Sequence, residues 1–170
     1  MAALQTFRGG LLDDWKPSAD CQNVLDALKI GAGDITAAAR AATVSVVSPV
    51  WNCRAFEPGE TSITEGRRIT LNAGSWSEPT FRRIEYDPFG LVTGPSSRAM
   101  ATMMHELIHV VHETTFLGDE WSLLLGTVGG DRVIATLLHS SNLMSEAEAT
   151  LVFAGTTRAI TTVLEQACFK

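Results

Sequence analysis

The sequence predicts a single α+β domain, because strand patterns lie mainly in the first half of the chain and helical patterns in the second. Its 170 residues suit one compact domain, which we expect to span residues 1–170. Apolar residues make up 45% of the chain and charged residues 19%, a balance typical of globular and not of disordered proteins. We therefore expect a small sheet packed against several helices.

The first elements are two helices and a strand. Residues 20–29 have the apolar spacing of a helix, and Ser18 or Asp20 is available as its cap. Residues 35–42 are rich in alanine and favour a second helix. Residues 43–48 are β-branched and precede a proline, which predicts a strand.

The middle of the chain predicts a wide hairpin. Residues 51–66 contain proline and glycine and favour a loop. Residues 67–72 and 81–86 both have strand patterns, and the turn-rich residues 73–79 lie between them. The next residues, 90–95, are predicted to form a loop.

The remainder of the chain is predicted to be helical. One helix starts at Ser96 or Ser97 and runs to about Thr114. After a glycine-rich break, residues 133–139 form another helical stretch. Residues 145–166 are predicted as one last helix, because they open with the capping-box pattern S-x-x-E.

Charge and hydropathy exclude several classes of protein. The net charge is −6, whereas a general nucleic-acid binder needs a basic surface. No apolar run approaches the roughly 18 residues of a membrane span. Residues 1–15 carry Arg8, two glycines and two aspartates, so we expect no cleavable signal peptide. We expect a monomer that binds neither nucleic acid nor membrane.

Cysteine usage leaves the redox compartment open. Cys21, Cys53 and Cys168 are too few and too scattered for a disulfide scaffold or a zinc ribbon. A bridge between Cys21 and Cys53 would leave Cys168 free. The alternative is that all three are buried thiols.

The chemically informative stretch is the motif His105-Glu106-Leu107-Ile108-His109, which matches the pattern H-E-x-x-H. On a helix, His105 and His109 project only about 40° apart and lie one turn apart. Two imidazoles placed in this way can share one tetrahedral zinc ion at about 2.0–2.1 Å. Glu106 lies beside the first ligand, where its carboxylate can accept a proton from a water on the metal. The pattern predicts a zincin-like fold, with an active-site helix and a second, C-terminal helix packed against it.

His112 is a third histidine on the same helix. It lies about 10 Å along the axis from His105, too far to complete the same zinc sphere on a straight helix. The metzincin pattern has a glycine at this position, so a metzincin is not expected. His112 is either a polar residue of the helix face or a hydrogen-bond donor to the transition state.

The third zinc ligand is expected to be a carboxylate, with His139 as a less favoured choice. Asp119 and Glu120 follow His109 at the short spacing of aspzincin-like enzymes. Glu146 and Glu148 begin the last predicted helix, as in gluzincins. We favour Glu148, although the capping box alone also accounts for it. Glu148 shares one helical face with a seam of small and apolar residues: Val152, Gly155, Ala159 and Val163.

A longer stretch around the motif resembles a known family. The run R-R-I-E-Y-D-P, a short loop and A-T-M-M-H-E-L-I-H-V-V-H-E are similar to the zinc metallopeptidases found as bacterial secreted effectors. These include type III effector peptidases and the C-terminal peptidase domain of some type VI secretion spike proteins. The resemblance covers about residues 82–113.

The resemblance implies a set of roles. His105, His109 and a downstream glutamate, matching Glu148 or Glu146, would hold Zn²⁺, and Glu106 would be the catalytic base. It also implies a toxin or effector that is fused to or carried by a secretion component and delivered into the periplasm or cytosol of another cell.

These observations predict a zinc-dependent endopeptidase that hydrolyses a protein or peptide substrate. Two other functions stay open: a metal-dependent hydrolase of a non-peptide bond, such as a cell-wall amide, and a binding module with structural zinc. Residues 67–72 are a candidate edge strand to which an extended substrate adds, or else an ordinary member of the sheet.

Overall fold

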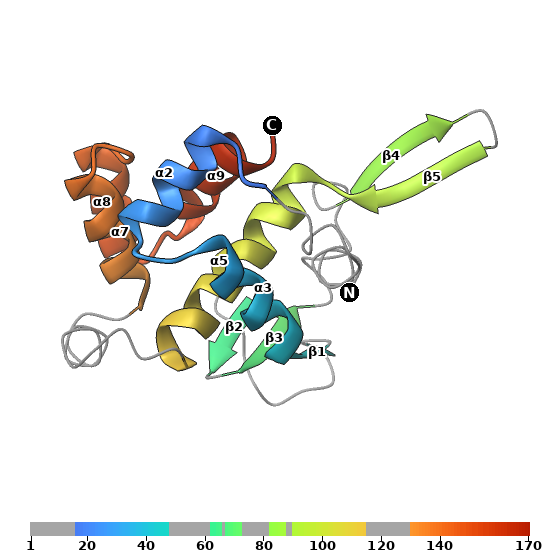
Figure 1. The fold of residues 1–170 in the computed structure, drawn as a ribbon, viewed down its shortest axis with the longest axis horizontal. Helices are drawn as coiled ribbons and strands as arrows, with labels where there is room; N and C mark the ends of the chain where they lie inside the picture. The colour runs from blue at the N-terminus through green and yellow to red at the C-terminus, as the bar shows by residue number, and fades with distance from the viewer. Residues whose placement is uncertain (1–15, 48–61, 66, 73–81, 88–89, 115–129) are drawn as a thin grey trace.

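The computed structural model describes residues 16–47, 62–65, 67–72, 82–87, 90–114 and 130–170 (Figure 1). This part of the chain is mostly helical with small sheets, in agreement with the predicted α+β class. Among the described residues, no helix is both long and apolar enough to cross a membrane. The helices are α2 (Ala19–Ala27), α3 (Ala32–Ala41), α5 (Ser97–Thr114), α7 (Gly130–Ser140), α8 (Glu146–Phe153) and α9 (Arg158–Cys168).

Three strands form a mixed sheet in the order β1-β3-β2: β1 (Thr43–Val47), β2 (Ser62–Glu65) and β3 (Arg68–Asn72). Strand β3 runs parallel to β1 and antiparallel to β2. The predicted loop over residues 51–66 is therefore interrupted by β2. Because β3 is the central strand, both of its backbone edges are already paired. The suggestion that residues 67–72 form a free edge for substrate is wrong.

A separate two-stranded hairpin precedes the central helix. Strand β4 (Arg82–Asp87) pairs with β5 (Gly90–Pro95) in antiparallel register, from Arg82 opposite Pro95 to Asp87 opposite Gly90. The predicted hairpin between residues 67–72 and 81–86 is thus wrong, and so is the predicted loop over 90–95. Glycine and proline normally mark loops, but an edge strand tolerates both. Figure 1 shows this hairpin extending from the body and leading into α5.

Helix α5 is the centre of the molecule. Residues 101–108 are all buried. Helices α3 and α9 and strand β2 pack on α5. In Figure 1, α2, α7, α8 and α9 lie on one side of α5, and α3 with the three-stranded sheet lies on the other. The helix that carries the H-E-x-x-H motif is therefore enclosed by the rest of the domain, which holds its side chains in place.

The last predicted helix is two helices, α8 and α9. The chain breaks at residues 154–157, where Gly155 has a φ of 96°, a left-handed conformation that glycine adopts readily. The capping box at Ser145 is confirmed, because Ser145 and Glu148 bond each other reciprocally at the start of α8. The seam of small residues predicted along one helix is divided between two, so it cannot form a single packing face.

A disulfide joins Cys21 on α2 to Cys168 at the end of α9, with Cα atoms 4.6 Å apart. Both predicted alternatives are wrong: Cys21 does not pair with Cys53 to leave Cys168 free, and the three cysteines are not all thiols. Cys53 itself lies outside the described residues. The pairing follows from the packing of α2 against α9. The Ser18 hydroxyl, which donates to the Ala167 carbonyl at 2.9 Å, strengthens the same junction.

Candidate metal centre

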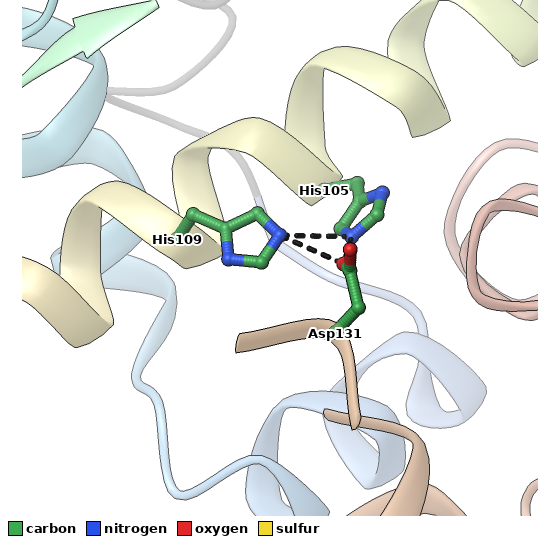
Figure 2. Close-up of side chains that lie close together, drawn as sticks. All are labelled: His105, His109 and Asp131. Atoms are coloured by element: carbon green, nitrogen blue, oxygen red, sulfur yellow. Dashed lines mark hydrogen bonds and ion pairs between the residues drawn. The ribbon is translucent and has the colours of Figure 1, made fainter. Parts of the chain in front are cut away.

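His105 and His109 project from neighbouring turns of α5 toward the same point (Figure 2). Their Nε2 atoms are 3.1 Å apart, and the ring planes are tilted by 40°. This is the convergence that the i, i+4 spacing predicts. The two histidines therefore present a pair of ligand atoms to one ion.

Asp131 supplies the third ligand atom. It lies in the first turn of α7, and its Oδ1 is 2.7 Å from Nε2 of His105 and 2.9 Å from Nε2 of His109. Within the part of the chain that the structure describes, these three residues form the group of His, Cys, Asp or Glu side chains that could hold a metal ion. Figure 2 shows the carboxylate meeting both rings from the opposite element.

The geometry and chemistry of this group fit a zinc ion. Ligand atoms at about 2.0–2.1 Å from tetrahedral zinc lie about 3.3 Å apart, so the observed triangle needs only a small outward shift. Two imidazoles and one carboxylate form a donor set used by catalytic zinc sites. In those sites, water or substrate takes the fourth position.

The carboxylate of Asp131 is held in its ionised form. Burial alone would raise its pKa, but hydrogen bonds and charge interactions with His105 and then His109 outweigh this effect. They hold the pKa of Asp131 well below its usual range. A deprotonated carboxylate is the form that binds a metal ion.

The group runs from the interior toward the surface. The exposed fraction of the side chain is 5% for His105, 14% for His109 and 35% for Asp131. The ion would thus be anchored on a buried helix and reached from the side of α7. Solvent access on one side is a requirement for a site that turns over substrate.

Glu106 and His112 lie on the same helix and are both buried. Burial, and to a lesser extent the charge of His109, lowers the pKa of His112 to about 4. A hydrogen bond with the Leu28 backbone raises this pKa but does not offset the other two effects. His112 is therefore neutral at neutral pH and faces the end of α2. It does not join the three ligands, as its distance along the helix predicted.

The favoured third ligand, Glu148, does not join the metal group. Its Oε2 accepts hydrogen bonds from the Ser145 N–H at 2.9 Å and from the Ser145 hydroxyl at 2.6 Å. These bonds lower the pKa of Glu148, as expected for a capping carboxylate. The two alternatives in this region, Glu146 and His139, are exposed, and His139 contacts the Met144 carbonyl through Nδ1 at 3.0 Å.

The other proposed ligands, Asp119 and Glu120, lie outside the described residues. Sequence reasoning missed Asp131 because it follows two glycines, which predict a break between helices. One feature of the sequence could have indicated Asp131: it is an acidic residue directly before a helical apolar pattern, and the segment that precedes it is long enough to lead back to His109. The same description fits Glu146, so this signal does not single out Asp131.

Comparisons with family models, with curated proteins and with solved structures find no match for this chain.

Proposed function

We propose that this chain is a zinc-dependent endopeptidase with a zincin-like active site. His105, His109 and Asp131 hold the metal, and Glu106 is the general base. One observation carries the proposal: the two histidines of an H-E-x-x-H motif converge with a third, anionic ligand from a different helix. A chance pair of histidines on a core helix would need no such partner.

Zinc bound here would lower the pKa of a water molecule toward about 7 and polarise the scissile carbonyl. Glu106 accepts a proton from the attacking water as its oxygen bonds to the carbonyl carbon. Glu106 then returns this proton to the amine nitrogen as the C–N bond breaks. Its place next to His105 on one rigid helix sets the base beside the metal ligands.

The surroundings of the site suit this chemistry. His105 and Glu106 are buried, so bulk water is excluded from one side of the reacting groups. Charges interact more strongly in such a poorly solvated region. The anionic Asp131 balances part of the charge of a divalent ion.

The resemblance to secreted effectors and the disulfide together support delivery into an oxidising compartment. Disulfides persist in the periplasm and outside cells and are rare in the cytosol. The Cys21–Cys168 bridge thus favours the periplasm over a host cytosol as the place of action. The periplasm holds the cell wall, so hydrolysis of a cell-wall amide is the second candidate function.

The test combines metal analysis with two substrates. We expect about one zinc ion per wild-type chain, and loss of that ion in the double variant His105→Ala plus His109→Ala. Glu106→Gln should keep the zinc and the fold but lose hydrolysis by at least about 10²–10⁴-fold. Zymograms with protein and with peptidoglycan then separate the two activities.

Each outcome has a definite meaning. Activity of a zinc-loaded Glu106→Gln variant close to wild type would refute the role of the base. If the wild type and Glu106→Gln both bind zinc stoichiometrically and neither hydrolyses either substrate, the chain is a binding module with structural zinc.

A further inference from the structure

Asp131 lies in the first turn of helix α7 and not in the middle of the helix. The first four N–H groups of a helix have no partner within the helix, and helix ends fray. The two histidines, in contrast, come from the middle of the buried helix α5. The precision of the site therefore depends on what holds the first turn of α7.

Arg132, the next residue, contacts the end of helix α8. Its Nη2 donates a hydrogen bond to the Phe153 carbonyl at 3.1 Å. Its guanidinium carbon lies 5.9 Å from the centre of the Phe153 ring, within the range of a cation–π contact. Phe153 is the last residue of α8, where carbonyls lack helical partners and the helix dipole attracts a cation.

Helix α8 is a firm point of attachment. The capping box at Ser145 closes its first turn, and Ala149 and Val152 are buried beneath it. The contact lies at the protein surface, where Arg132 is exposed and Phe153 is 40% exposed. The ring and the carbonyl of Phe153 contact the same guanidinium group.

We propose that Arg132 is a positioning residue for the metal centre, acting through its contact with Phe153. The buried residues Val133, Ile134 and Ala135 hold the body of α7. The contact of Arg132 with α8 adds a fixed point for the rotation of the first turn, since neighbouring residues on a helix project about 100° apart. That rotation determines whether the Asp131 carboxylate meets both histidines. This inference rests on the metal centre proposed above and adds a residue that sets its affinity.

The sign of the effect separates positioning from charge. Arg132 is a cation next to a ligand of a cation, so by charge alone its removal would tighten zinc binding. If Arg132 positions Asp131, its removal weakens zinc binding instead. Residues that orient metal ligands typically change affinity by about 10–100-fold, and we expect about tenfold here because Arg132 acts through the backbone.

The experiment measures zinc affinity by competition with a chromophoric chelator. R132M keeps the apolar stem and should bind zinc about tenfold more weakly, whereas R132K keeps a charged donor and should recover part of the loss. F153A removes the ring but keeps the carbonyl, so a loss of only about twofold is expected. R158M is the matched control, because it removes an exposed cation at the start of α9 and should stay within about twofold of wild type.

A second measurement reports ligand geometry directly. With Co²⁺ in place of zinc, R132M should show altered visible absorption bands, and R158M should match wild type. Unchanged or tighter zinc binding by R132M, with unaltered cobalt bands, would overturn the proposal. If R132M is unfolded at the assay temperature, R132K decides, and wild-type affinity with unaltered cobalt bands in R132K would overturn the proposal equally.

The variant His105→Ala keeps the two proposals apart. If zinc binding does not depend on His105, the metal centre itself is refuted, and the role of Arg132 with it. If binding depends on His105 but not on Arg132, only the positioning role is refuted.

Discussion

The disulfide between Cys21 and Cys168 should contribute strongly to stability. The bonded residues are 147 positions apart, so the bridge closes a loop that includes nearly the whole described chain. By the chain-entropy argument, closing a loop of this length destabilises the unfolded state by about 5 kcal/mol at 25 °C, and native disulfides contribute about 2–5 kcal/mol when measured. For a domain of this size, each kcal/mol corresponds to roughly 2–4 °C in melting temperature.

The perturbation is the double variant Cys21→Ala plus Cys168→Ala. Alanine is chosen because Cys21 is fully buried, and a serine hydroxyl there would add the cost of an unsatisfied polar group. Urea unfolding of the oxidised wild type and the double variant should differ by about 3–5 kcal/mol. A reductant should lower the stability of the wild type by a similar amount and leave the double variant unchanged.

Cys53→Ala is the matched control. This variant should retain its response to reductant, because Cys53 is not part of the bridge. Equal urea midpoints for the wild type with and without reductant would refute the reasoning. So would a loss of the reductant response in Cys53→Ala.

Two further predictions concern the metal centre and the buried histidine. Asp131→Asn should weaken zinc binding by at least about tenfold, whereas Glu148→Ala should keep the zinc and lose only about 1 kcal/mol of stability, as chelator competition and melting curves would show. The pKa of His112 is about 4 in the folded protein, whereas the ordinary histidine value of 6.5 applies to the unfolded chain. Between pH 4 and pH 6.5, the unfolded chain therefore binds more protons at His112 than the folded protein does. The free energy of unfolding therefore loses nothing to His112 above pH 6.5 and falls by up to about 3 kcal/mol as the pH drops to about 4. In metal-free protein, His112→Phe should flatten that part of the pH–stability curve, and an unchanged slope would contradict the assignment.

Local sequence features located several of the helices, although the last predicted helix is in fact α8 and α9. The period of apolar residues and the capping signals located α2, α5 and α7 to within a few residues. The capping box at Ser145 is confirmed as well, because both of its partners lie within one turn. The convergence of His105 and His109 also follows from spacing on a single helix. Each of these features depends on residues that are three or four positions apart.

Pairings between distant segments could not be predicted in the same way. Glycines and prolines mark loops and edge strands alike, so β5 was missed and β4 was assigned to the wrong partner. The partner of Cys21 depends on α2 lying against α9, which no local pattern encodes.

The sequence by itself determined that two histidines and a glutamate share one helix, and hence that a metal site was to be expected there. Only the tertiary structure decided which carboxylate lies beside the two histidines. Several acidic residues follow His109, and along the chain they differ only in position. Asp131 meets the two histidines because the packing of α7 on α2, α8 and α9 brings its first turn to α5, while Glu148 is engaged by its own helix cap. The spacing of residues along one helix predicts which side chains of that helix share a face. It does not predict which residue of another helix packs against that face.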